Sequence, residues 1–160
     1  MGEWTLHELA ANHPVFGLAK LTAIAVGLPL ARLTLPYYAC GALLMGWAYF
    51  ARLWRMPMAN QLLALTTFMV ALPPISYFYA LVHLYAAWVV LVFVAIRAEK
   101  AGVRVKGLKM AMILFVGLFA SFMVLTFPRV GLFGGLVQAG MLIALWLCAV
   151  EFRLEDTERI

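Results

Sequence analysis

Long apolar stretches run through almost the whole chain and are separated only by short polar segments. Prolines and charged residues delimit six of them, at about residues 14–32, 36–53, 57–72, 75–96, 110–127 and 131–150. Of the 160 residues, 66% are hydrophobic and 12% charged, whereas a soluble domain is about half apolar and a quarter charged. Because about 20 apolar residues cross a bilayer as one helix, we predict an all-α polytopic membrane protein with about six transmembrane helices.

Positive charges are divided unevenly between the segments that join these stretches. If every stretch crosses the membrane, one side carries nine cations, which are Arg52, Arg55, Arg97, Lys100, Arg104, Lys106, Lys109, Arg153 and Arg159. The other side carries only Arg32 and Arg129. Cytoplasmic loops are enriched in Lys and Arg, so we expect the nine-cation side and both termini in the cytoplasm. Residues 1–13 and 151–160 are then cytoplasmic, residues 14–150 form the transmembrane domain, and Lys20 lies about a turn inside the cytoplasmic edge.

Acidic residues are confined to positions outside the apolar stretches. They are Glu3, Glu8, Glu99, Glu151, Glu155, Asp156 and Glu158. Cation-coupled transporters usually keep a carboxylate within the membrane, and calcium sites and two-carboxylate hydrolases need paired acids. The chain also has no phosphate-binding glycine motif and too few suitably placed histidines for a haem or zinc site. We therefore expect no cofactor, no metal site and no nucleic-acid partner.

The third stretch is shorter than the others. Its 16 or so residues reach roughly 24 Å as a helix, less than the roughly 30 Å of a hydrocarbon core. It also carries Asn60 and Gln61 near its cytoplasmic end. A re-entrant helix is one interpretation, but five full crossings would place the two cationic loops on opposite sides. We therefore keep six crossings.

The densest group of polar and aromatic residues follows Pro73 and Pro74. Ser76, Tyr79 and His83 are spaced i, i+3 and i+7, which places them on one face of an α-helix. His83 then lies about 10–12 Å below the extracytoplasmic start of that helix, and we expect it to face protein or a wet cavity. The alternative is structural: the tyrosines belong to an interfacial aromatic belt, and His83 bonds another helix.

Arg129 is the better held of the two cations expected on the outer side. It lies in a tight turn, Phe127-Pro128-Arg129-Val130-Gly131, between the last two stretches. A guanidinium binds a phosphate through two parallel hydrogen bonds, so Arg129 is a candidate for holding a lipid phosphate. Simple contact with lipid headgroups is the alternative.

The run from Pro57 to Val94 resembles the late transmembrane segments of glycosyltransferase family 87. The shared features are a short span, a proline break, a Ser-aromatic-x-Tyr turn and a histidine entering the next span. The closing stretch, from Gly131 to Leu154, also looks like the end of such an enzyme. These are membrane enzymes of the GT-C class, which transfer a sugar, typically mannose, from a polyprenyl phosphate at the extracytoplasmic side.

The resemblance implies roles for several residues. His83 becomes the candidate catalytic residue, and Ser76, Tyr77, Tyr79 and Arg129 become candidates for binding the lipid-linked sugar. Family members are much longer, however, and carry an acidic residue in an early outer loop that serves as the general base. Since this chain has no acidic residue on that side, we expect it to be the C-terminal membrane part of such a glycosyltransferase, incomplete alone.

Two other functions stay open. A non-catalytic six-span scaffold or accessory subunit accounts for the missing carboxylates, and a small transporter accounts for a helix broken at a proline pair. The expected partners are membrane lipid, a polyprenyl-phosphate sugar, and an N-terminal half or partner membrane subunit. The expected location is a membrane, the bacterial cytoplasmic membrane in particular.

Overall fold

The computed structural model describes residues 15–73, 78–125 and 131–154, and within these ranges every regular element is helical. The elements are α2 (Phe16–Val26), α3 (Leu30–Ala51), the 3₁₀ turn η1 (Leu53–Arg55), α4 (Met58–Ala71), the 3₁₀ helix η2 (Phe78–His83), α5 (Leu84–Lys100), α6 (Leu108–Leu125) and α7 (Gly131–Glu151). The predicted all-α class is therefore confirmed for this part of the chain. One described helix, Leu81–Lys100, which joins the end of η2 to α5, is long and apolar enough to cross a membrane, and α2, α4 and the described parts of α6 and α7 are shorter apolar helices.

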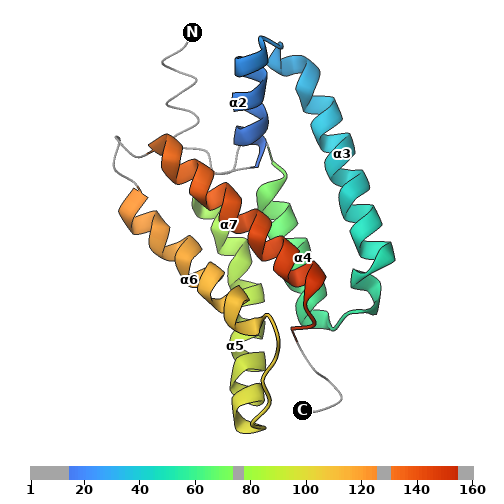
Figure 1. The fold of residues 1–160 in the computed structure, drawn as a ribbon, viewed down its shortest axis with the longest axis vertical. Helices are drawn as coiled ribbons and strands as arrows, with labels where there is room; N and C mark the ends of the chain where they lie inside the picture. Colours follow the sequence, from blue (N-terminus) through green and yellow to red (C-terminus); the bar gives the residue numbers. More distant parts are fainter. Residues whose placement is uncertain (1–14, 74–77, 126–130, 155–160) are drawn as a thin grey trace.

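Helices α4 to α7 form the packed body of the molecule (Figure 1). Helix α7 packs against α4 on one side and α6 on the other, and α4 also packs against α5. The side chains between these helices are fully buried and apolar, among them Leu63, Leu91, Phe115, Leu142 and Leu145. Ala59, Ala64 and Ala149 are also buried there. Such small side chains let the backbones of two helices approach closely.

The boundary between the first two helices differs from the prediction. We expected a break before Pro36, but Pro36 lies inside α3 and the chain turns at Gly27, Leu28 and Pro29 instead. Gly27 adopts the left-handed conformation (φ 73°), and the Leu28 N–H donates to the Ala23 carbonyl at 2.9 Å, which ends α2. Pro36 is the seventh residue of α3, where it lacks an N–H for the Arg32 carbonyl and its ring crowds that carbonyl, yet the helix continues through it.

Helix α2 runs antiparallel to α3 and is only 11 residues long (Figure 1). Its first residue, Phe16, contacts the Tyr37 ring edge-to-face, with 4.8 Å between ring centroids. Lys20 follows one turn later and therefore lies on the Arg32 side of Tyr37. We expected Lys20 near the cation-rich end instead, and that prediction is wrong because α2 begins beside the upper half of α3.

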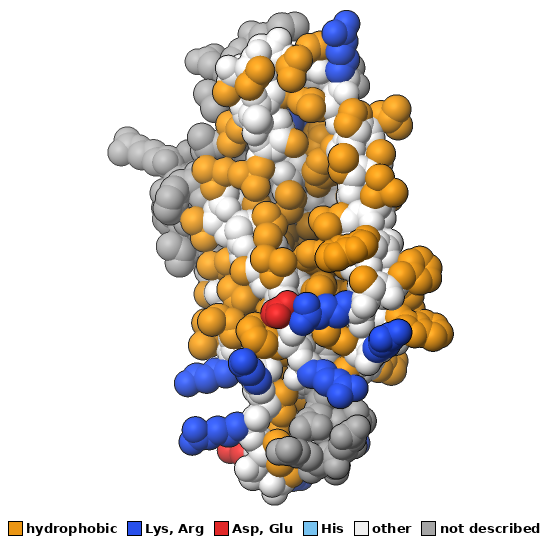
Figure 2. Space-filling view, turned by 45° about the vertical axis from the view of Figure 1, so that its right-hand side comes forward, with side chains coloured by type: hydrophobic (Ala, Val, Ile, Leu, Met, Phe, Trp, Pro, Cys, Tyr) orange, Lys and Arg blue, Asp and Glu red, His pale blue; other side chains and the backbone are white. Residues whose placement is uncertain are grey.

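Cations from three separate segments gather at one end of the molecule (Figure 2). The Arg52 guanidinium, after α3, lies 2.8 Å from a carboxylate oxygen of Glu151 at the end of α7. The Lys106 ammonium, between α5 and α6, lies 5.7 Å from the centre of the Phe152 ring. We call this end the cationic rim, and its described members, all exposed, are Arg52, Arg55, Arg97, Lys100, Arg104, Lys106, Lys109 and Arg153.

Candidate functional site: an apolar cleft beside helix α3

Most of the predicted site lies outside the residues that the structure describes. Ser76, Tyr77 and Arg129 fall in undescribed segments, and for Tyr79 only the backbone is described, within η2. His83 is the last residue of η2, its side chain is exposed, and α5 begins at Leu84. The predicted set of site residues therefore stays a prediction.

The local geometry around His83 does differ from the expected α-helix. A 3₁₀ helix has three residues per turn, so residues i and i+3 share a face and residues i and i+4 do not. Tyr79 and His83, four residues apart in η2, consequently do not lie on one face. We expected His83 to face protein or a cavity, and its exposure shows that the side chain is not enclosed by the described helices.

The described helices enclose a cleft between α3 and the pair α4 and α7. Helix α3 packs closely against α2 but only loosely against α4 and α7 (Figure 1). The resulting space has a volume of about 490 Å³. It is lined by Val15, Tyr37, Cys40, Gly41, Leu44, Phe68, Ala71, Leu72, Leu142, Ile143, Trp146 and Leu147. Its volume lies within the range of about 300–1,000 Å³ that is usual for small-molecule sites.

Two contacts hold α3 beside the bundle, one at each end of this cleft. Near the α2–α3 turn, the Tyr37 hydroxyl donates to the Ala71 carbonyl oxygen at 3.2 Å. At the cationic rim, a second guanidinium nitrogen of Arg52 donates to the Glu151 carbonyl oxygen at 3.2 Å. Between them, the side chain of Leu72 lies against the backbone of Gly41. A Cβ built on Gly41 would lie 2.6 Å from the Leu72 Cδ1, so a larger residue would displace the Leu72 side chain.

The lining chemistry suits a hydrocarbon chain and not a reaction. Only Tyr37 and Cys40 among the lining residues have titratable side chains, and Tyr37 already donates its hydroxyl proton to Ala71. The lining thus offers no carboxylate or histidine for general acid–base catalysis. The cleft is therefore suited to binding an apolar chain by contact area alone.

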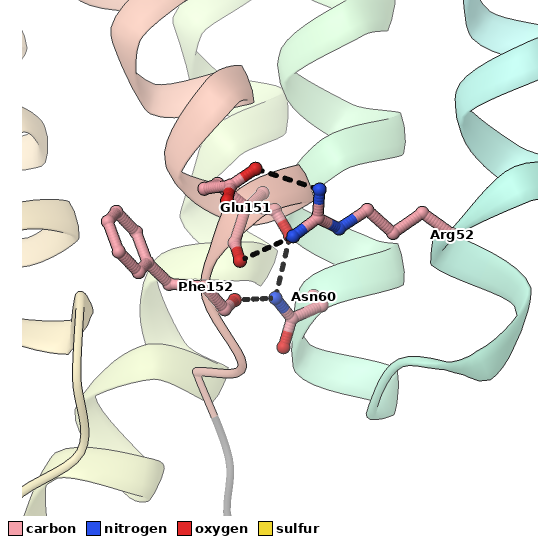
Figure 3. Close-up of polar contacts among 5 residues, drawn as sticks. Arg52, Asn60, Glu151 and Phe152 are labelled. Carbon is pink, nitrogen blue, oxygen red and sulfur yellow. Dashed lines mark hydrogen bonds and ion pairs between the residues drawn. The ribbon is translucent and has the colours of Figure 1, made fainter.

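A polar cluster at the cationic rim joins the ends of α3, α4 and α7 (Figure 3). The Asn60 amide nitrogen donates to the carbonyl oxygens of Ala149 and Phe152, at 2.7 and 2.6 Å. The Leu154 N–H donates back to the Asn60 Oδ1 at 3.0 Å. The last carbonyls of a helix have no partner within the helix, so Asn60 caps α7 from a neighbouring helix.

Sequence reasoning placed Asn60 near the end of a short helix but missed this role. Asn60 is fully buried, and Thr67 and Gln138 are the other fully buried polar residues in the described ranges. All three lie on α4 or α7, the two helices at the centre of the bundle. The available signal was the amide pair Asn60 and Gln61 at the start of an apolar stretch, because a buried amide requires partners.

Comparisons of this chain with protein-family models, curated proteins and solved structures give no match. Cys40 is free and exposed in the cleft region, and Cys148 is free and buried near the cationic rim.

Proposed function

We propose that this chain is an integral protein of the bacterial cytoplasmic membrane, with the cationic rim and residues 151–160 on the cytoplasmic side. The exposed sides of its helices support this, since large apolar side chains there include Leu35 (78% exposed), Leu43 (74%), Phe93 (62%) and Ile113 (57%). Figure 2 shows such side chains covering the face that it presents, with cations mainly at one end. In water this exposed area would be unfavourable, whereas lipid tails accommodate it. Crossings by α3 to α7 are part of this proposal, whereas α2, with 11 residues and its start beside Tyr37, is too short to cross.

The same proposal gives the cleft a ligand: the polyprenyl chain of a lipid-linked sugar. The observation that carries it is the position of the cleft, whose α4 wall ends at Leu72, immediately before Pro73 and Pro74. The polar residues expected to hold the phosphate and sugar follow this proline pair in the sequence. In this proposal, Ser76, Tyr77, Tyr79 and Arg129 hold the phosphate and sugar of a lipid whose apolar chain occupies the cleft, and His83 contacts the sugar or acceptor.

In this role the chain is the C-terminal membrane part of a glycosyltransferase that uses a polyprenyl-phosphate sugar. Its cleft binds and orients the donor, and the base that activates the acceptor comes from another segment or from a partner membrane subunit. A hydroxyl acceptor needs such a base. The described acidic residues, Glu99 and Glu151, both belong to the cationic-rim ends of their helices.

Retention of polyprenyl phosphate by the purified protein in detergent, measured by native mass spectrometry, tests the cleft. Gly41→Leu places a side chain into the cleft, and Leu44→Trp fills it from its half-exposed edge. Gly46→Leu is the matched control because a Cβ there meets nothing within 4 Å. We expect both cleft variants to lose the bound lipid and Gly46→Leu to keep it. Equal retention by all three variants would contradict the cleft assignment.

A non-catalytic accessory subunit is the second candidate function, favoured by the absence of acid–base groups from the cleft lining. Membranes that contain the chain together with its partner subunits separate the two functions. We expect transfer of labelled mannose from polyprenyl-phosphate mannose, and its loss in His83→Ala. Mannose transfer that is unchanged both by His83→Ala and by removal of the chain would contradict the catalytic role. The accessory role would then be the one that stays open.

A further inference from the structure

We infer that the cationic rim is a binding surface for anionic phospholipids of the leaflet that faces it. This inference rests on the membrane location proposed above, but it does not depend on sugar transfer or on the cleft. The partner chemistry is a phosphodiester with a net negative charge and two acyl chains, as in phosphatidylglycerol. The rim would recognise the phosphate, and the adjoining apolar helix faces would contact the acyl chains.

The charge balance of the rim is the first observation. In the sequence, the segments that carry the rim, residues 52–57, 97–109 and 151–160, hold nine cations against five acidic residues, which are Glu99, Glu151, Glu155, Asp156 and Glu158. One of these, Glu151, already pairs with Arg52 at 2.8 Å. The rim thus carries a net positive charge in the described ranges, and its side chains are exposed. Lys and Arg near an anionic membrane surface are attracted to it, each contributing severalfold to binding.

An aromatic ridge on α3 and η1 is the second observation. Trp47 and Phe50, which are 68% and 78% exposed, share one face of α3 by their i, i+3 spacing, and Trp54, in η1, is 65% exposed. The ridge ends beside Arg52 and Arg55. Tryptophan is enriched where the headgroups of a bilayer meet its hydrocarbon core. We therefore expect the ridge to fix how deep the protein lies in the membrane. The rim cations then lie at the level of the lipid phosphates.

The connections that carry the rim are held in place, which is the third observation. The Lys106 ammonium lies over the Phe152 ring, and the backbone of Gly107 approaches Phe152 so closely that a Cβ there would lie 2.5 Å from the Phe152 Cβ. The Arg52 and Glu151 pair joins the ends of α3 and α7. Cations from different segments are thereby ordered before a lipid binds, which lowers the entropic cost of binding.

Competition between two lipids tests the inference. The protein is placed in vesicles of equal parts phosphatidylglycerol and phosphatidylcholine and extracted gently, and the co-purified lipids are counted by native mass spectrometry. We expect phosphatidylglycerol to be enriched at least about fivefold over phosphatidylcholine. Arg55→Gln and Arg153→Gln should each reduce this enrichment severalfold, and Arg55→Lys should largely restore it. Arg32→Gln, at the other end of α3, is the matched control and should leave it unchanged.

Equal retention of the two lipids by the unmodified protein overturns the inference, as does an enrichment that Arg55→Gln and Arg153→Gln leave intact. Gly41→Leu separates this result from the cleft proposal. We expect that variant to lose polyprenyl phosphate while keeping the preference for phosphatidylglycerol. Loss of that preference in Gly41→Leu, with the rim variants unaffected, would assign anionic lipid to the cleft and overturn the rim assignment.

Discussion

The side-chain amide of Asn60, in the first turn of α4, donates to the carbonyl oxygen of Phe152, just after α7, at 2.6 Å. The two residues are 92 positions apart in the chain. Together with the bonds to Ala149 and Leu154, this contact gives hydrogen-bond partners to buried backbone groups at the end of α7. It therefore fixes how α4 and α7 meet at the cationic rim.

Asn60→Ala should lower the free energy of unfolding in detergent by about 2 kcal/mol or more. The substitution removes three hydrogen bonds and leaves two carbonyls and one N–H buried without partners, each costing about 1 kcal/mol or more. Gln61→Ala is the control, because the Gln61 amide donates to the Met56 carbonyl at 3.0 Å from a half-buried position. A loss no greater for Asn60→Ala than for Gln61→Ala would show that the cap contributes little.

The ion pair between Arg52 and Glu151 should contribute much less than Asn60. Its side chains are 47% and 59% exposed, and exposed pairs are worth about 0.2–1 kcal/mol. A double-mutant cycle with Arg52→Gln and Glu151→Gln measures the coupling directly. We expect a coupling free energy within that range that shrinks at high salt. A coupling well above 1 kcal/mol that is insensitive to salt would indicate a buried pair instead.

Gly107→Ala should destabilise the fold more than Gly102→Ala. Both glycines have positive φ, at 86° and 66°, so both substitutions strain the backbone by about 1 kcal/mol. An alanine Cβ at Gly107 also collides with Phe152, whereas one at Gly102 meets nothing within 4 Å. Thermal denaturation in detergent compares the two variants. An equal loss of stability would mean that the loop and Phe152 are not in contact.

Thr67→Val should leave stability unchanged or raise it by up to about 1 kcal/mol. The Thr67 hydroxyl is fully buried and has no hydrogen-bond partner among the described residues, so valine removes an unpaired polar group at nearly constant volume. Thr66→Val is the matched control, since the Thr66 hydroxyl donates to the Leu62 carbonyl at 2.7 Å. We expect Thr66→Val to be the less stable of the two variants, and the opposite order would contradict the burial of Thr67.

The sequence predicted well the helices whose ends are marked by proline and charge. The last stretch was expected at 131–150 and the helix spans Gly131–Glu151, while the short third stretch between Pro57 and Pro73 became α4. The α2–α3 boundary failed for a physical reason. The helix α3 continues through Pro36, so this proline does not mark a boundary, whereas Gly27 adopts the left-handed conformation that ends α2 without a steric cost.

The cleft and the Asn60 cap could not be predicted from the sequence. The cleft depends on the separation of α3 from α4 and α7, which is set by residues far apart in the chain such as Tyr37 and Ala71. The Asn60 partners are two backbone carbonyls and one backbone N–H, groups that almost every residue has, so no side-chain pattern marks them. The spacing of apolar residues predicts which face of a helix is buried. It does not predict how closely each neighbouring helix packs against that face.

Lipid occupancy of the cleft is measured most directly by the fluorescence of Trp146, which lines it. A variant that keeps Trp146 and replaces the other tryptophans by phenylalanine is placed in unbrominated vesicles and titrated with brominated polyprenyl phosphate. A variant that keeps only Trp47, on the exposed face of α3, is the control. We predict saturable quenching of Trp146 at about one lipid per chain, and only weak, linear quenching of Trp47. Linear quenching of equal extent in both variants would contradict a lipid site in the cleft.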